Sequence, residues 1–228
     1  MNTQFKLIGF DLDGTLVNSL PVLALSVNSA LAESDLPQAL EVLVLTWIGN
    51  GAPVLIARAF DWAQKQTGKA LTEEEIKQVT ERFNFYYGEN LCNVSLLYPN
   101  VKETLETLKE KGYVLAVVTN KPTRHVQPVL AAFGIDHLFS EMLGGQSLPA
   151  IKPHPGPLYY LCGKFGFEPR QVLFVGDSKN DIIAGHTAGC AVVGLTYGYN
   201  YNVPIEQANP TFVTSNFADV LEISTKEI

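Results

Sequence analysis

Residues 5–16 read FKLIGFDLDGTL and hold the strongest structural signal in the chain. The run Phe5–Phe10 is almost wholly apolar and does not alternate, which predicts a strand buried on both faces of a parallel sheet. Asp11 and Asp13 follow, so an extended chain can point both carboxylates the same way, and Gly14 permits a sharp turn. Ligand sites of open α/β sheets lie beyond the carboxyl ends of the strands. The pattern therefore indicates a site, although a polar strand-end turn alone also explains it.

Further short runs rich in Val, Ile, Leu and Phe predict the rest of the sheet. They lie at Tyr113–Val118, Glu141–Leu143, Val172–Val175, Ala191–Leu195 and, as a late edge strand, Thr211–Val213. Helical patterns separate these runs, and strands that alternate with helices imply right-handed crossovers. The prediction is an α/β fold: a Rossmann-like open parallel sheet with helices on both faces.

One long segment contains no convincing strand. Helical patterns occupy it at Pro21–Ala32, Leu36–Thr46, Pro53–Thr67 and Thr72–Tyr87, and the last begins with the pattern of an N-terminal capping box. This predicts a small all-helical domain, residues 18–95, inserted after the first strand. The α/β core would then comprise residues 1–17 and 96–228.

Composition excludes several classes of protein. The 228 residues include 16 Lys+Arg and 23 Asp+Glu, a net charge of −7, which argues against phosphate-mediated nucleic-acid binding and against an anionic membrane surface. We find no apolar run long enough to span a bilayer, and Asp11 comes too early for a signal peptide. Cys92, Cys162 and Cys190 are scattered, as expected of free thiols in a reducing compartment. We therefore expect a cytoplasmic protein.

A second acidic strand end follows Val172–Val175. Residues 176–181 read GDSKND, and Asp177 and Asp181 would lie one turn apart if a helix begins here. Either could be a simple N-cap, but that does not explain two acidic strand ends in one acidic chain. Brought together, Asp11, Asp13 and Asp177 would repel one another unless a cation neutralised them. Because oxygen ligands favour a hard ion, we expect Mg²⁺.

Two other strand ends carry polar residues. Thr119 and Asn120 follow Tyr113–Val118, and Lys152 precedes a helix predicted near Pro155. Singly, Thr119 could be an N-cap and Lys152 a surface charge. In chain order, however, the four positions supply a carboxylate pair, a hydroxyl, an ammonium and an acidic metal site. Transfer of a phosphoryl group to a carboxylate requires this set.

These motifs together resemble those of the haloacid-dehalogenase-like hydrolase superfamily, and the helical insertion resembles its cap. The shared motifs are DLDGT at residues 11–15, Thr119 after a buried strand, Lys152-Pro153, and GDSKND at residues 176–181. Within the superfamily the chain is most similar to bacterial phosphoglycolate phosphatases. That similarity lies in TWIGNG at residues 46–51, TNKP at 119–122, KPHP at 152–155 and YGYN at 197–200.

The resemblance implies Mg²⁺-dependent hydrolysis of 2-phosphoglycolate to glycolate and phosphate through an aspartyl phosphate. Asp11 would be the nucleophile, and Asp13 would be the general acid and base. The metal would bind the carboxylates of Asp11 and Asp177 and the backbone carbonyl of Asp13, while Asp181 would orient the loop or a metal-bound water. The residues that would bind the phosphoryl group are Thr119, Asn120 and Lys152.

The loop at residues 47–52 is a candidate lid over this site. Gly49 and Gly51, which flank Asn50, would let the backbone approach a substrate closely, although an ordinary helix–turn–helix connection before Pro53 explains the pattern as well. Arg58 could pair with a substrate carboxylate if it points inward; otherwise it is an exposed arginine. The histidines lack ligand spacing.

Two positions depart from what the resemblance implies. Related proteins usually carry Asp where this chain has Asn18, which should keep the hydrogen bonds but lose a charge at the hinge of the insertion. They also tend to carry an acid where this chain has Gln146, which puts a metal or water role at that position in doubt.

Two alternative functions remain open. One is a capped phosphatase for sugar phosphates or nucleotides, or a phosphomutase, of the same superfamily. The other is a phosphoacceptor signalling domain, which needs neither a helical cap nor an acid two residues beyond the acceptor. We expect a small phosphomonoester as the ligand, no nucleic acid or membrane partner, and a monomer or homodimer.

Overall fold

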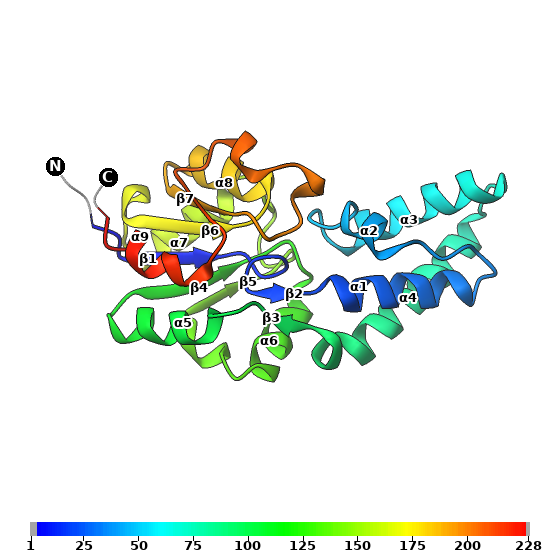
Figure 1. The fold of residues 1–228 in the computed structure, drawn as a ribbon, viewed down its shortest axis with the longest axis horizontal. Helices are drawn as coiled ribbons and strands as arrows, with labels where there is room; N and C mark the ends of the chain where they lie inside the picture. The colour runs from blue at the N-terminus through cyan, green and yellow to red at the C-terminus, as the bar shows by residue number, and fades with distance from the viewer. Residues whose placement is uncertain (1–3, 227–228) are drawn as a thin grey trace.

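The computed structural model describes residues 4–226 and contains a six-stranded parallel sheet (Figure 1). In spatial order its strands are β5 (Glu141–Leu143), β4 (Val114–Val118), β1 (Leu7–Phe10), β6 (Val172–Gly176), β7 (Ala191–Leu195) and β8 (Phe212–Thr214). β1 pairs with β4 on one side and with β6 on the other. The winding direction therefore reverses at β1, and such a switch point opens a crevice beyond the carboxyl ends of the strands. The predicted sheet is confirmed, with strand ends shifted by at most two residues.

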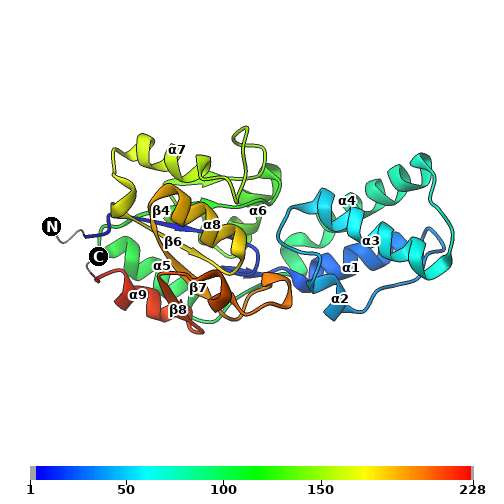
Figure 2. The same cartoon turned by 90° about the horizontal axis from the view of Figure 1, so that it is seen from above.

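Helices cover both faces of the sheet (Figure 2). One face packs against α5 (Val101–Glu110), α6 (Thr123–Ala132) and α9 (Val220–Ile223), and the other against α7 (Gly156–Phe165) and α8 (Lys179–Ala188). Ile8 and Phe10 of β1 belong to the first core, whereas Leu7 belongs to the second. Burial on both sides explains why β1 reads as a continuous apolar run.

Four helices form an insert between β1 and β4, beside the carboxyl ends of the strands (Figure 1). They are α1 (Leu20–Ala32), α2 (Glu41–Leu45), α3 (Ala52–Thr67) and α4 (Glu73–Val94). The chain enters through β2 (Val17–Asn18) and leaves through β3 (Leu96–Leu97), which pair antiparallel, so the two connections lie side by side. α4 begins with the predicted capping box of Thr72 and Glu75. In the described part of the chain no helix is both long and apolar enough to cross a membrane.

Two predicted helix bounds are wrong. The helix expected over Leu36–Thr46 spans only Glu41–Leu45. Pro37 disfavours the helical conformation of the residue before it, and the backbone of Ala39 is bound by the side chain of Asn28 through two hydrogen bonds of 2.8 Å. At the other end of the insert α4 continues past Tyr87 to Val94, because Leu91 extends its buried face by another turn.

Candidate active site

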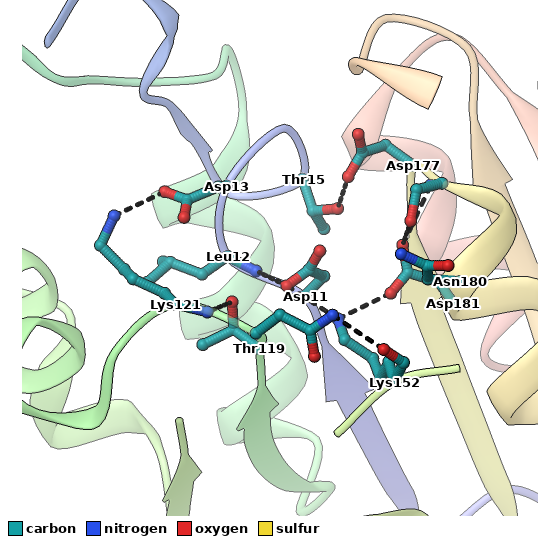
Figure 3. A network of polar contacts seen from close by, with 12 residues as sticks. Asp11, Leu12, Asp13, Thr15, Thr119, Lys121, Lys152, Asp177, Asn180 and Asp181 are labelled. Carbon is teal, nitrogen blue, oxygen red and sulfur yellow. Dashed lines mark hydrogen bonds and ion pairs between the residues drawn. The ribbon is translucent and has the colours of Figure 1, made fainter. Parts of the chain in front are cut away.

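Three carboxylates from neighbouring strand ends meet at the carboxyl edge of the sheet (Figure 3). Asp11 follows β1, whereas Asp177 and Asp181 follow β6, and each offers an oxygen within 4.8 Å of the others. Asp177 accepts hydrogen bonds of 2.8 Å from the Thr15 hydroxyl and from the Tyr199 backbone N–H. The pairing of β1 with β6 thus unites the two acidic motifs.

Gly14 is required for this approach. Its φ of +86° lies in the left-handed region that favours glycine, and a Cβ at this position would lie 2.3 Å from Oδ2 of Asp177. Glycine is therefore needed here for two reasons: it allows the turn after Asp13, and it leaves room for the Asp177 carboxylate.

Lys152 provides a fixed positive charge beside these acids. Its Nζ lies 2.8 Å from Oδ1 of Asp11 and 2.6 Å from Oδ1 of Asp181 (Figure 3). Burial by itself would lower the pKa of Lys152, but the two carboxylates outweigh it and raise this pKa above its usual range. Lys152 is therefore a buried ammonium rather than a surface charge.

One ammonium does not neutralise three carboxylates, of which Asp177 and Asp181 are buried and Asp11 is half-buried. Burial raises the pKa of Asp11 to about 6, with the nearby Asp181 adding to the effect, and burial raises the pKa of Asp177 well above its usual range. The charges of Asp11, Asp177 and Asp181 exceed that of Lys152 by two, which a divalent cation would balance. Their carboxylate oxygens are donors for a hard cation. The group can therefore hold a metal ion.

Thr119 and Asn120 directly follow β4, which pairs with β1 on the side opposite β6. Thr119 is buried, and its hydroxyl accepts a hydrogen bond of 3.2 Å from the Lys121 backbone N–H. The Asn120 side-chain amide donates to the carbonyl oxygens of Lys152 at 2.9 Å and Gly49 at 3.4 Å. Its buried Oδ1 has no hydrogen-bond partner among residues 4–226. That oxygen is thus a buried acceptor without a partner.

Asp13 lies on the far side of Asp11 from Asp177 and Asp181, next to Lys121 (Figure 3). Its Oδ1 lies 2.8 Å from Nζ of Lys121 and also accepts a hydrogen bond from the Ser19 hydroxyl. The hydroxyl of Tyr87, on α4, binds the same ammonium. Sequence reasoning gave no role to Lys121 or Tyr87; the only signal was that Lys121 belongs to the TNKP motif.

The loop at residues 47–52 touches the core at both of its glycines. Gly49 has a φ of +117°, and a Cβ there would lie 2.7 Å from the Tyr201 hydroxyl. Gly51 has a φ of +84°, and a Cβ there would lie 3.2 Å from the carbonyl oxygen of Asn120. The close approach, which a plain helix connection would not require, favours the lid interpretation.

Asn50 and Arg58 act within this loop. The side-chain oxygen of Asn50 accepts hydrogen bonds from the Tyr201 hydroxyl at 2.9 Å and from Arg58 at 3.0 Å. Arg58 also donates to the Trp47 carbonyl oxygen at 2.8 Å. Arg58 is half-buried and braces the loop, and it is not among the residues that line the cavity described next.

A small cavity of about 40 Å³ lies between the insert and the core. Its core wall contains Asp11, Asp13, Thr119, Asn120, Lys121 and Pro122. The opposite wall comes from the insert and contains Leu23, Ile48, Gly49, Gly51, Ala52, Leu55 and Tyr87. Asp11, Asp13 and Thr119 therefore line one side of a cavity whose other side comes from the helical insert.

Both departures from the related sequences have structural accounts. Asn18 Oδ1 accepts hydrogen bonds from the Leu20 N–H at 3.2 Å and the Tyr199 hydroxyl at 2.9 Å, so hydrogen bonding at the hinge is kept. Gln146 Oε1 accepts from the backbone N–H of Thr123 at 2.9 Å, at the start of α6. Gln146 thus supports a helix terminus rather than the acidic group.

A parallel sheet with carboxylates, a buried lysine and a threonine at its carboxyl edge is the arrangement expected of an α/β enzyme that transfers phosphoryl groups. Residues 8–195 match the family of haloacid dehalogenase-like hydrolases. A phosphoglycolate phosphatase of Haemophilus influenzae is 88% identical over 223 residues, which cover 98% of this chain and 100% of that protein. One of Pasteurella multocida is 79% identical over 221 residues, 97% of this chain and 99% of that protein.

Among solved structures, the crystal structure of a predicted phosphoglycolate phosphatase from Haemophilus somnus superposes with a TM-score of 0.96 at 74% identity. The match covers 97% of this chain and 99% of that one. The chain belongs to the haloacid dehalogenase-like hydrolase family. The predicted family is confirmed.

Proposed function

We propose that this enzyme is a Mg²⁺-dependent phosphatase that hydrolyses 2-phosphoglycolate to glycolate and phosphate. The observation that carries the proposal is the small cavity in which Asp11 and Asp13 face the apolar wall of the insert. Relatives that carry the name phosphoglycolate phosphatase are similar over almost the whole chain, which supports the same activity here.

The proposed reaction uses Asp11 and Asp13 in sequence. An Asp11 oxygen attacks phosphorus in line, a covalent aspartyl phosphate forms, and the bond from phosphorus to the glycolate oxygen breaks while Asp13 gives that oxygen a proton. Asp13 then takes a proton from water as the water attacks the phosphoenzyme, which releases phosphate and regenerates Asp11. The two carboxylates have separate partners, since Lys152 contacts Asp11 and Lys121 contacts Asp13.

Charge stabilisation would come from Lys152, Thr119 and the metal. The Lys152 ammonium and the Thr119 hydroxyl would donate to the phosphoryl oxygens, on which the negative charge is spread. A magnesium ion held by Asp11 and Asp177, with the Asp13 carbonyl as a further ligand, would supply electrostatic stabilisation of that charge. Asp181 would act through its contacts, because it already binds Lys152 and the Ser178 hydroxyl.

The helical insert would act as a cap that excludes large leaving groups. We propose residues 18–95 as the cap domain and residues 1–17 and 96–228 as the core. The cavity between the cap and the core is small, about 40 Å³. A two-carbon acid fits this size better than a sugar or a nucleoside.

We expect hydrolysis of 2-phosphoglycolate to exceed that of hexose phosphates and nucleotides by at least about 100-fold in kcat/KM, because the larger leaving groups prevent closure of the cap. A panel of phosphomonoesters assayed for released phosphate measures this. EDTA should abolish the activity, and added Mg²⁺ should restore it. Equal rates across the panel would instead favour a broad phosphatase of the same family.

The contact between Tyr201 and the loop at residues 47–52 can be tested by removing the Tyr201 hydroxyl. Tyr201→Phe takes away the donor to Asn50 and the acceptor for the Asn180 amide at 3.1 Å, so we expect kcat/KM for 2-phosphoglycolate to fall about 3- to 10-fold. Tyr159→Phe is the matched control, because its hydroxyl bonds the Thr187 carbonyl on the core surface. An unchanged kcat/KM in the Tyr201 variant would contradict a role of this contact in closure.

Two further properties stay predictions: the cytoplasm as the compartment, and a monomer or homodimer as the assembly. The three cysteines are free thiols, with Cys92 exposed and Cys162 and Cys190 buried, which is compatible with a reducing compartment.

A further inference from the structure

Lys121 is a buried ammonium with a donor to spare. Its side chain is 1% exposed, and its Nζ binds Oδ1 of Asp13 and the hydroxyl of Tyr87. An ammonium has three N–H donors, and among residues 4–226 only these two acceptors are hydrogen-bonded to it. Because Lys121 lines the cavity, the third donor is available to a molecule bound there.

This ammonium is also the one positive charge on the wall of the cavity within the described residues. Burial by itself would lower the pKa of Lys121, but Asp13 and Tyr87 outweigh it and raise this pKa above its usual range. The opposite wall contains the apolar side chains Leu23, Ile48 and Leu55, and its polar groups, the backbone of Gly49 and Gly51 and the Tyr87 hydroxyl, carry no positive charge. An anionic group on the leaving side of the substrate would therefore have Lys121 as its partner.

We propose that Lys121 selects phosphomonoesters whose leaving group carries a carboxylate, by binding that carboxylate with its third N–H. The proposal rests on the proposed function, in which Asp13 contacts the ester oxygen that leaves. In 2-phosphoglycolate one methylene joins that oxygen to the carboxylate, and Lys121 lies 2.8 Å from Asp13. One ammonium can thus contact the acid and the carboxylate together. A neutral leaving group of the same size gains nothing from it.

The test compares two substrates in Lys121→Met, which keeps the length of the side chain and removes its charge. The substrates are 2-phosphoglycolate and 2-hydroxyethyl phosphate, in which a neutral hydroxymethyl group replaces the carboxylate. The readout is the ratio of their kcat/KM values. Loss of the contact between Lys121 and Asp13 lowers the rates for both substrates, so this effect cancels in the ratio. We expect the ratio to fall about 100-fold, mainly through a higher KM for 2-phosphoglycolate, as for loss of one member of a buried charge pair.

Tyr87→Phe is the matched control, because it removes a neighbour of the ammonium and keeps the charge. It should retain the substrate ratio of the wild type. If Lys121→Met does not fold, Lys121→Gln keeps a donor without the charge, and its ratio should fall as well. If both charge-removing variants keep the wild-type ratio, the proposed role of Lys121 is wrong, whereas the proposed substrate is not affected. A wild-type enzyme without preference for 2-phosphoglycolate overturns the proposed substrate and, with it, the selection.

Discussion

Asp11→Asn should lower kcat for 2-phosphoglycolate by at least about 10⁴-fold, as loss of a covalent nucleophile does in other hydrolases. The asparagine keeps the size of the side chain, and its oxygen can still accept from the Leu12 N–H, which lies 2.7 Å from Oδ1 of Asp11. An amide, however, cannot attack phosphorus to form the phosphoenzyme. Steady-state rates measure the loss. Mass spectrometry after acid quenching should find covalent phosphate on the wild type alone.

An exposed aspartate provides the control for this variant. Asp35 lies beyond the C-terminus of α1, outside the residues that line the cavity, and its φ of 54° suits asparagine. Asp35→Asn should therefore keep the wild-type rate. Turnover by Asp11→Asn above about 1% of the wild type, with no trapped phosphoenzyme in either protein, would contradict the role of Asp11.

Asp177→Asn should destroy activity and yet stabilise the metal-free protein. Burial raises the pKa of Asp177 well above its usual range, with Asp181 and Asp11 adding to the effect. The ionised carboxylate therefore costs folding free energy at neutral pH, and the neutral amide removes that cost. The amide oxygen can still accept from the Tyr199 N–H, and the amide NH₂ can donate to the Thr15 hydroxyl, which now accepts.

We expect a gain of about 1 kcal/mol in the free energy of unfolding, or about 2–4 °C in Tm, when both proteins are measured in EDTA. Added Mg²⁺ should raise the Tm of the wild type, because an ion that binds only the folded state stabilises it by mass action. It should do little for Asp177→Asn. An equal rise in both proteins would show that Asp177 is not a ligand, and a lower Tm of the variant in EDTA would contradict the repulsion argument.

The strands and the four strand-end motifs were predictable because each is a local signal, whereas the order of the strands in the sheet follows from pairing between distant segments. A strand buried on both faces must be apolar at every position, as Leu7 and Ile8 illustrate. The helical insert was predictable from the helical spacing of its apolar residues and from the capping box that Thr72 and Glu75 form at the start of α4. The error at Leu36–Thr46 arose because a side chain from another helix, that of Asn28, satisfies the backbone of Ala39.

That the loop at residues 47–52 lies against the core could be seen only from contacts across the molecule. The pattern Gly49-Asn50-Gly51 also fits a plain turn, and nothing within it reveals that Tyr201 and Asn120 lie against it. The sequence likewise left the partners of Arg58 open, and the structure shows that it donates to the Trp47 carbonyl oxygen and to the Asn50 side chain.

From the amino-acid sequence alone one can derive the parallel sheet, the helical insert and the acidic residues at the strand ends, because hydrophobic period and strand-end chemistry depend on near neighbours in the chain. The size of the cavity, the buried state of Lys152 and the pairing of Lys121 with Asp13 and Tyr87 depend on tertiary packing. Each of these is set by side-chain volumes and charges from segments far apart in the chain. Burial then turns ordinary lysines and aspartates into groups with shifted pKa values, and that environment exists only in the folded protein.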